Sequence, residues 1–151
     1  MSHKILVTNR KARHEFQLME RFEAGIVLIG SEVKALREGK GNVKEAYVRF
    51  SRGELYLVGM HIGEYSHSGY TSHTPVHDRK LLLTRRELKK LTRLTLEKGV
   101  TMVPLSVYLK RGWVKLEFAL ARGKKQWDKR QDIKQRESDR ETKRALKQAI
   151  R

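Results

Sequence analysis

Residues 100–122, VTMVPLSVYLKRGWVKLEFALAR, decide the fold of this chain. Both halves are rich in β-branched and aromatic residues, and Arg111-Gly112 separates them, which is typical of a β-hairpin. In the second half, apolar side chains alternate with Lys115 and Glu117, so one face of that strand is expected to be buried. Pro104 cannot donate a ladder hydrogen bond and predicts an edge or a bulge in the first half.

Three further segments carry strand patterns. FEAGIVLIG, residues 22–30, is dense in β-branched residues and predicts a buried strand. YVRFSRGELYLVG, residues 47–59, predicts a second hairpin around Arg52-Gly53. HIGEY, residues 61–65, is a further short candidate. The polar segment at 66–78 contains a glycine and a proline and is expected to be a mobile loop.

Two helices are expected between these strands. The first covers residues 31–39, with Ser31 as N-cap and Gly39 at its end. The second starts at Thr84, which forms a capping box with Glu87 and is followed by a stop at Gly99. Its apolar face carries Leu88, Leu91 and Leu94, and its other face carries Arg85, Arg86, Lys89, Lys90 and Arg93.

Together these elements predict a mainly β (α+β) protein. We expect a single OB-like β-barrel of about six strands with two to three helices over residues 1–122. A basic tail follows at residues 123–151.

The charge of the chain predicts a polyanionic partner. Lys and Arg number 34 against 17 Asp and Glu, a formal net charge of +17. Nucleic acid is the first candidate partner and an acidic membrane surface the second. The alternative is a stable basic protein whose charged faces are merely solvated.

Other features exclude whole classes of function. The chain has no cysteine, which removes disulfides, thiolate zinc sites and cysteine nucleophiles and fits a reducing cytoplasm. The N-terminus resembles no signal peptide, and the longest uncharged apolar run, residues 24–30, is far shorter than the roughly 20 residues of a membrane span. We therefore expect a cytoplasmic protein with no membrane partner and no cofactor.

The tail, residues 123–151, has a composition unlike the rest. It holds 11 Lys and Arg against 5 Asp and Glu, and its few large apolar side chains cannot cover a core, so we expect it to be disordered when free. On a helix, one stripe would carry Arg136, Arg140, Lys143, Arg144, Lys147 and Arg151. Such a stripe could follow a phosphate backbone, leaving Trp127 to stack on a base. The alternative is a solvated tail with no specific role.

Five blocks of the sequence carry a resemblance to a known family. They are NRKARHEF at 9–16, FEAGIVLIGSEVKALREGK at 22–40, RKLLLTRREL at 79–88, VPLSVYLKRGWVKLEFALARGKKQWDKR at 103–130 and DIK at 132–134. In these blocks the chain resembles small protein B, the bacterial tmRNA-binding (SsrA-binding) protein family.

The resemblance implies a function in ribosome rescue. It implies an OB-like barrel that binds the tRNA-like domain of tmRNA and delivers it to stalled ribosomes for trans-translation. The tail would lie in the empty mRNA channel, turn helical there and reach the decoding centre. The implied partners are tmRNA, the ribosome and elongation factor Tu with the aminoacylated tmRNA. A monomer without enzymatic activity is expected.

The resemblance also implies site residues. For tmRNA binding these are Asn9, Arg10, Lys11, Arg13, His14, Glu23, Leu82 and Lys115. For the decoding centre they are Gly123, Lys124, Lys125, Trp127, Asp128, Lys129 and Arg130. The charged stripe of the tail adds Arg136, Arg140 and Arg144 as expected contacts in the mRNA channel. Glu23 would accept from a base edge or a ribose hydroxyl, or else be a solvated carboxylate. Leu82 could equally belong to the core, and Lys115 is expected to point outward.

Two rival interpretations remain open at this point. Four histidines in one segment, His61, His67, His73 and His77, suggest a ribonuclease or, with Asp78, a metal site, although their spacing matches no ligand pattern. Composition is equally compatible with a generic RNA-binding or ribosomal structural protein, because phosphate contacts carry no sequence information.

Overall fold

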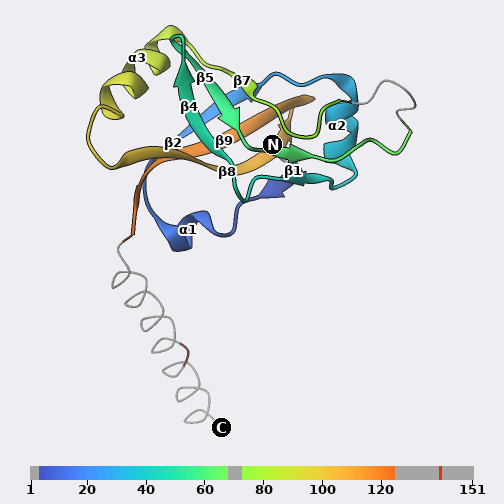
Figure 1. Ribbon diagram of the computed structural model, residues 1–151, viewed down its shortest axis with the longest axis horizontal. Coiled ribbons are helices and arrows are strands. Elements are labelled where there is room, and N and C mark those ends of the chain that lie inside the picture. Colours follow the sequence, from blue (N-terminus) through green and yellow to red (C-terminus); the bar gives the residue numbers. More distant parts are fainter. Residues whose placement is uncertain (1–3, 68–72, 125–139, 141–151) are drawn as a thin grey trace.

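The structure, a computed structural model, describes residues 4–67, 73–124 and 140 (Figure 1). Within them the chain forms nine strands and three helices. Their order is β1 (Lys4–Thr8), α1 (Ala12–Glu15), β2 (Phe16–Ile26), α2 (Gly30–Arg37), β3 (Gly41–Asn42), β4 (Tyr47–Ser51), β5 (Glu54–Val58), β6 (His61–Ile62), β7 (Arg79–Leu82), α3 (Arg85–Leu94), β8 (Val100–Lys110) and β9 (Trp113–Gly123).

The predicted hairpin of residues 100–122 is confirmed as β8 and β9. The two strands pair from Lys110 opposite Trp113 to Val100 opposite Arg122. The turn residues Arg111 and Gly112 have φ values of 52° and 82°, the left-handed pair that a two-residue hairpin turn requires. The register shifts between Pro104 and Ser106, so the bulge expected at the proline is also confirmed.

Six strands close into a ring around the core. Neighbouring strands pair in the order β8, β4, β5, β7, β2 and β9, and the β8–β9 hairpin closes the circle. β1 adds to β8 outside the ring, while β3 and β6 form a separate two-stranded sheet. The mainly β class and the expected number of helices are thereby confirmed. No helix among the described residues is long and apolar enough to cross a membrane.

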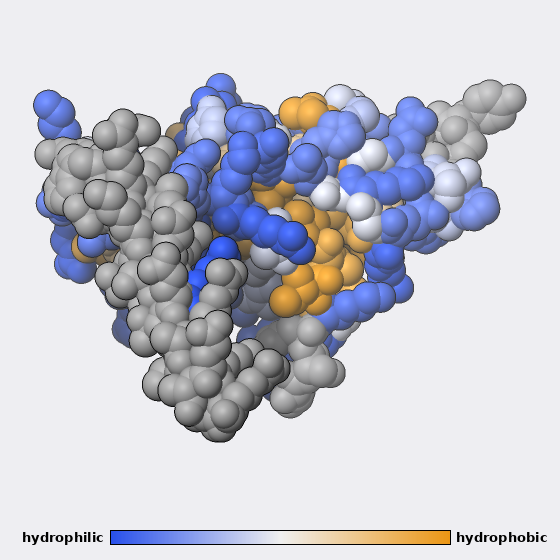
Figure 2. All heavy atoms as spheres, turned by 90° about the horizontal axis from the view of Figure 1, so that it is seen from below, coloured by the Kyte–Doolittle hydropathy of each residue, from blue (hydrophilic) through white to orange (hydrophobic). Residues whose placement is uncertain are grey.

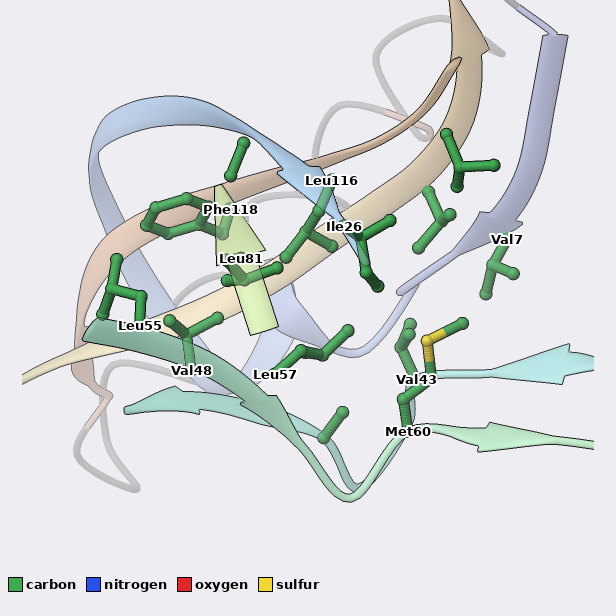
Figure 3. Close-up of a cluster of buried hydrophobic side chains, with 14 of the residues drawn as sticks. Val7, Ile26, Val43, Val48, Leu55, Leu57, Met60, Leu81, Leu116 and Phe118 are labelled. Atoms are coloured by element: carbon green, nitrogen blue, oxygen red, sulfur yellow. The ribbon is translucent and has the colours of Figure 1, made fainter. Parts of the chain in front are cut away.

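The inward faces of the ring strands supply one hydrophobic core (Figure 3). Leu55 and Leu57 of β5, Leu81 of β7, and Leu116 and Phe118 of β9 have no exposed surface. These residues come from segments far apart in the chain, so the core is completely buried only when the ring of strands is closed. A buried core of this kind is the main source of folding free energy.

Helix α3 confirms the predicted capping box. Thr84 Oγ1 accepts from the Glu87 amide at 3.2 Å, and Glu87 Oε1 accepts from the Thr84 amide at 3.2 Å. Leu91 is buried, and Leu88 and Leu94 pack against the core. The helix ends at Leu94, so the stop predicted at Gly99 lies too far along the chain.

Helix α2 begins differently from the prediction. Its N-cap is Ile29, not Ser31, and the Glu32 side chain accepts from the Ile29 amide at 3.1 Å. Ser31 lies inside the helix, where its hydroxyl bonds to Nδ1 of His73 at 2.9 Å. Gly39 does follow the end of the helix, with φ of 81°.

A buried ion pair joins α2 to β7. Arg79 Nε donates to Glu32 Oε2 at 2.7 Å, and the two side chains are at most 1% exposed. The guanidinium also donates to the carbonyls of Met60 at 2.7 Å and Pro75 at 3.1 Å. His77 Nε2 lies 2.9 Å from the same Glu32 oxygen. The network therefore fixes the segment before β7 to α2.

Three strand predictions need correction. The strand expected at 22–30 runs instead from Phe16 to Ile26, because Gly30 already starts α2. The short strands β1 and β7 were not predicted, since neither lies in a hairpin pattern such as the one around Arg52-Gly53. The mobile loop expected at 66–78 is wrong for His73, which is buried and bonds to the Ile62 carbonyl at 2.9 Å.

Candidate nucleic-acid interface

The structure divides the residues expected to bind tmRNA into two groups. Glu23 and Lys115 lie near one end of the β2–β9 pair, where Gly25 is opposite Lys115. Asn9, Arg10, Lys11, Arg13 and His14 lie at the other end, on and before α1. The residues Phe16 and Gly25 mark the two ends and are nine positions apart, roughly 30 Å along an extended strand. We call the second group the N-terminal corner. At the first end, where Leu82 also lies, the paired residues Leu82, Gly25, Lys115 and Tyr108 are called the outer-face row.

The outer-face row is a line of neighbours across the strands. Leu82 of β7 pairs with Gly25 of β2, Gly25 with Lys115 of β9, and Lys115 with Tyr108 of β8. Leu82 is 54% exposed, so it is not a core residue. Lys115 is half-buried and lies on the strand face opposite the buried Val114 and Leu116, as predicted. Strand pairing thus brings together Leu82 and Lys115, which are far apart in sequence.

A shallow depression lies beside this row. It has a volume of about 460 Å³ and is lined by Gly25, Ile26, Val27, Leu28, Val33, Leu82, Gly112, Trp113, Val114 and Lys115. Gly25 keeps it open, because a Cβ there would approach the Leu82 Cβ to 3.3 Å. Trp113 is 72% exposed at its edge. An exposed indole beside a lysine is an arrangement suited to stacking on a base next to a phosphate.

Glu23 is held in place next to the row. The Tyr108 hydroxyl donates to Glu23 Oε2, and Lys110 Nζ lies 3.4 Å from both carboxylate oxygens. The hydrogen bond from Tyr108 lowers the pKa of Glu23 against the effect of partial burial, and the charges of Lys110 and Lys115 lower it further. Burial and the Glu23 charge raise the pKa of Tyr108. At neutral pH the site therefore presents a fixed carboxylate with free acceptor positions.

The N-terminal corner is built on a single short helical turn. Ala12 of α1 is buried against Val103, Leu105, Ala119 and Ala121, on the opposite side of the hairpin from the main core. Asn9 is fixed to the bulge, since its side-chain amide donates to the Pro104 carbonyl at 2.8 Å. This packing leaves Arg10, Lys11 and Arg13 exposed and His14 half-buried.

The start of the tail lies at the same corner. Phe16 pairs with Gly123, and the Lys124 amide donates to the Glu15 carbonyl at 2.9 Å. α1 and the end of β9 are neighbours in Figure 1. Figure 2, seen from the side toward which α1 projects, shows hydrophilic residues over most of the described surface, with hydrophobic residues in the centre and at the upper edge of the view. The cations at positions 10, 11 and 13 therefore lie close to the first residues expected to reach the decoding centre.

Most of the residues predicted for the tail lie outside the described part of the chain. These are Lys125, Trp127, Asp128, Lys129, Arg130, Arg136 and Arg144. Gly123 and Lys124 are placed at the N-terminal corner, and Arg140 is exposed. The expectation of a tail that is disordered when free and helical when bound likewise concerns residues outside the described ranges.

The histidine segment has a structural explanation. His73 bonds to Ser31 and Ile62, and His77 bonds to the Glu32 carboxylate that Arg79 already holds. Among the described residues, no group of three or more His, Cys, Asp or Glu side chains could hold a metal ion. His73 and His77 therefore attach their segment to helix α2.

Three residues here were not predicted as site residues: Gly25 and Tyr108 of the outer-face row, and Trp113 in the depression beside it. Each was treated as part of a strand pattern. A signal was available for Trp113 alone, since it follows the Arg111-Gly112 turn with the same alternation as Lys115 and so faces outward. Gly25 and Tyr108 become neighbours of Lys115 through the strand register, which cannot be read from the sequence.

Comparison with known proteins gives a consistent result. The family profile described as "SmpB protein" matches residues 6–148. The SsrA-binding protein of Syntrophobacter fumaroxidans is 49% identical over 95% of this chain and 89% of its own length. That of Gloeobacter violaceus is 50% identical over 95% of both chains.

A solved structure agrees with these relatives. A chain from the work "tmRNA-SmpB: a journey to the center of the bacterial ribosome" superposes with a TM-score of 0.67 and 45% sequence identity, covering 80% of this chain and 85% of that one. The family profile spans nearly the whole chain, and the identities hold over almost its full length. The chain belongs to the SmpB family.

Proposed function

We propose that this protein binds tmRNA through its tRNA-like domain and carries it to stalled ribosomes for trans-translation. Membership of the SmpB family and the SsrA-binding names of its relatives support this function. The RNA-binding role is not an enzymatic one. The generic RNA-binding alternative explains the charge but not the similarity to these relatives.

The observation that carries the proposal is the outer-face row with its fixed carboxylate. Leu82, Lys115 and Glu23 come from three of the five sequence blocks that carry the family resemblance. Strand pairing brings them to one face of the sheet, the face on which Trp113 is exposed. A cation, a hydrogen-bond acceptor and an aromatic ring are the groups with which proteins recognise folded RNA and its ribose hydroxyls. We assign this row to the tRNA-like domain, and the N-terminal corner to a second segment of the same RNA.

The tail completes the proposed function. Residues 123–151 would lie in the mRNA channel, with Gly123, Lys124, Lys125, Trp127, Asp128, Lys129 and Arg130 at the decoding centre and Arg136, Arg140 and Arg144 along the channel. Its net charge of +6 and its lack of core residues support a segment that folds on ribosomal RNA. A channel already filled by mRNA would exclude the tail.

The finer assignments belong to the same proposal. The six-stranded ring with its β8–β9 closure supports an OB-like barrel over residues 1–122. We further propose that the protein acts as a monomer in the cytoplasm, together with elongation factor Tu and aminoacylated tmRNA. These last assignments rest on the family resemblance.

A binding measurement tests the proposal. We expect the full chain to bind the isolated tRNA-like domain of tmRNA more tightly than an ordinary tRNA, and to keep that preference as salt rises while both affinities fall. A generic binder would lose its preference as salt rises. Equal affinity for the two RNAs at about 0.15 M salt would refute the tmRNA function.

The tail has its own test in ribosome rescue. Trp127→Ala should reduce tagging of a nascent chain on a truncated message, whereas Trp127→Tyr should retain most of it, because stacking requires a ring. Both variants should bind the tRNA-like domain as the wild type does. Equal rescue by the two variants would remove the stacking role.

A further inference from the structure

A second cationic surface lies on α3, outside both groups of predicted tmRNA-binding residues. Arg86, Lys89, Lys90 and Arg93 line a depression of about 480 Å³ on this helix. They recur at spacings of three and four, so they form one stripe about 10 Å long. We call these four residues the α3 stripe.

Little negative charge neutralises the stripe. Lys90 pairs with Glu20 and lies 5.6 Å from the Phe22 ring centroid. For Arg86, Lys89 and Arg93, the described ranges contain no carboxylate within ion-pairing distance. The one acidic residue of the helix, Glu87, is bound to Thr84 in the capping box. Three adjacent cations thus repel each other in the free protein, and a polyanion would relieve this.

The chemistry of α3 favours a phosphate backbone over other partners. Its leucines pack on the core, and the exposed Leu96 lies two positions beyond the end of the helix, so no apolar side chain of the helix itself is exposed beside the stripe. A membrane-surface helix needs exposed apolar residues to insert, and a stable protein interface needs an aromatic or aliphatic anchor. A nucleic-acid backbone needs only cations.

The position of α3 relative to the end of β9 is the basis for choosing the RNA that the stripe would contact. Glu97, three residues after the helix, pairs with Arg122, and Val100 at the start of β8 lies opposite Arg122. Arg122 directly precedes Gly123, where the tail begins. The C-terminal end of α3 therefore adjoins the end of the fold from which the tail departs.

We propose that the α3 stripe binds the phosphate backbone of ribosomal RNA next to the path of the tail. This inference rests on the proposed function, which places the tail on ribosomal RNA. The folded domain and the tail would then hold the ribosome through two linked contacts. Linked contacts strengthen binding because the second forms at high effective concentration.

A pair of matched triple variants tests the inference. The test variant carries Arg86→Gln, Lys89→Gln and Arg93→Gln; glutamine preserves helix propensity. The control carries Lys4→Gln, Arg37→Gln and Arg52→Gln, which are also exposed and remove the same charge. Affinity is measured over a range of salt for ribosomes stalled on a truncated message and, separately, for the tRNA-like domain of tmRNA.

We expect the test variant to bind ribosomes roughly tenfold more weakly, with a slope of log affinity against log salt reduced by about 2 to 3. Its affinity for the tRNA-like domain should stay within about twofold of the wild type, and the control should change neither affinity by more than that. If the triple variant unfolds, Lys89→Gln alone should reduce the ribosome slope by about 1.

Several results would overturn the inference. Equal weakening by test and control variants would show an effect of net charge only. Unchanged ribosome binding would exclude the stripe, and loss confined to the tRNA-like domain would assign it to tmRNA instead. Binding of the wild type but not the test variant to anionic vesicles, with ribosome binding intact, would make it a membrane surface. Failure of the proposed function is distinguishable, because it appears in the wild type as equal affinity for tmRNA and tRNA.

Discussion

Glu23 and Glu32 lie nine positions apart in the sequence. Each contacts a basic side chain, but Glu23 does so at the surface and Glu32 in the interior. Glu32 is 1% exposed and is held by Arg79, His77 and the Ile29 amide. Glu23 lies on the outer face with 38% of its side chain exposed, held by Tyr108 and Lys110. The acceptor positions of Glu32 are largely occupied, whereas Glu23 retains some toward solvent.

This contrast distinguishes a carboxylate that stabilises the fold from one that can bind a ligand. The pKa of both groups is lowered, so the direction of the shift does not distinguish them. Burial raises the pKa of Glu32, but the Ile29 amide and Arg79 outweigh it. The two carboxylates differ in solvent exposure, so a ligand can reach Glu23, but not Glu32, without disturbing the core. Four measurements sharpen this comparison.

The largest effect is expected for Glu32→Gln. Loss of the carboxylate leaves the buried Arg79 charge without its partner, so the free energy of unfolding should fall by about 3–5 kcal/mol. Urea unfolding measures it. Glu64→Gln, at an exposed position, is the control and should change stability by less than about 0.5 kcal/mol. A Glu32→Gln variant as stable as the control would contradict the structural role.

The same substitution at the exposed carboxylate should act on binding. Glu23→Gln removes a charged acceptor, so affinity for the tRNA-like domain should fall by about 1.5–3 kcal/mol, tenfold or more. Stability should stay within about 0.5 kcal/mol of the wild type. A filter or fluorescence titration with this RNA gives the affinity. Loss of stability with unchanged affinity would place Glu23 in the same class as Glu32.

The exposed aromatic ring near Leu82 and Lys115 offers a narrower test. Trp113→Ala should weaken binding of the tRNA-like domain by about 1–3 kcal/mol, the value of one base stack. Leu96→Ala is the control, since Leu96 is 80% exposed against 72% for Trp113 and lies outside the outer-face row. The two variants should unfold at similar urea concentrations. Equal RNA affinities of the two would mean that the indole makes no stack.

The smallest effect concerns acid stability. Because the folded-state pKa of Glu32 is lowered, its contribution is complete above its ordinary value near 4.5 and is lost as pH falls through the folded-state value. The stability gap between wild type and Glu32→Gln should therefore narrow in acid. Urea unfolding from neutral pH to about pH 3 follows it. A gap that stays constant down to that pH would show that Glu32 keeps the same pKa when unfolded.

Local patterns predicted much of the fold. Both hairpins, the bulge at Pro104 and the Thr84 capping box were predicted because each depends on residues close in sequence. The N-cap predicted at Ser31 is wrong: Ile29 is the N-cap, and the Ser31 hydroxyl instead bonds to His73, 42 positions away. β7 was missed because its four residues form a strand only between β5 and β2. Such errors arise where a distant contact outweighs a local preference.

The charge, the turns, the capping box and the family resemblance can all be read from the sequence, because they depend on residue types and short spacings. Tertiary structure alone decided that Glu32 is buried and Glu23 exposed, and that Leu82, Gly25, Lys115 and Tyr108 share one row. It also brought the segment after α3 next to the last residues of β9. The physical reason is that closure of the ring fixes the register between distant strands, and no short stretch of sequence contains that register.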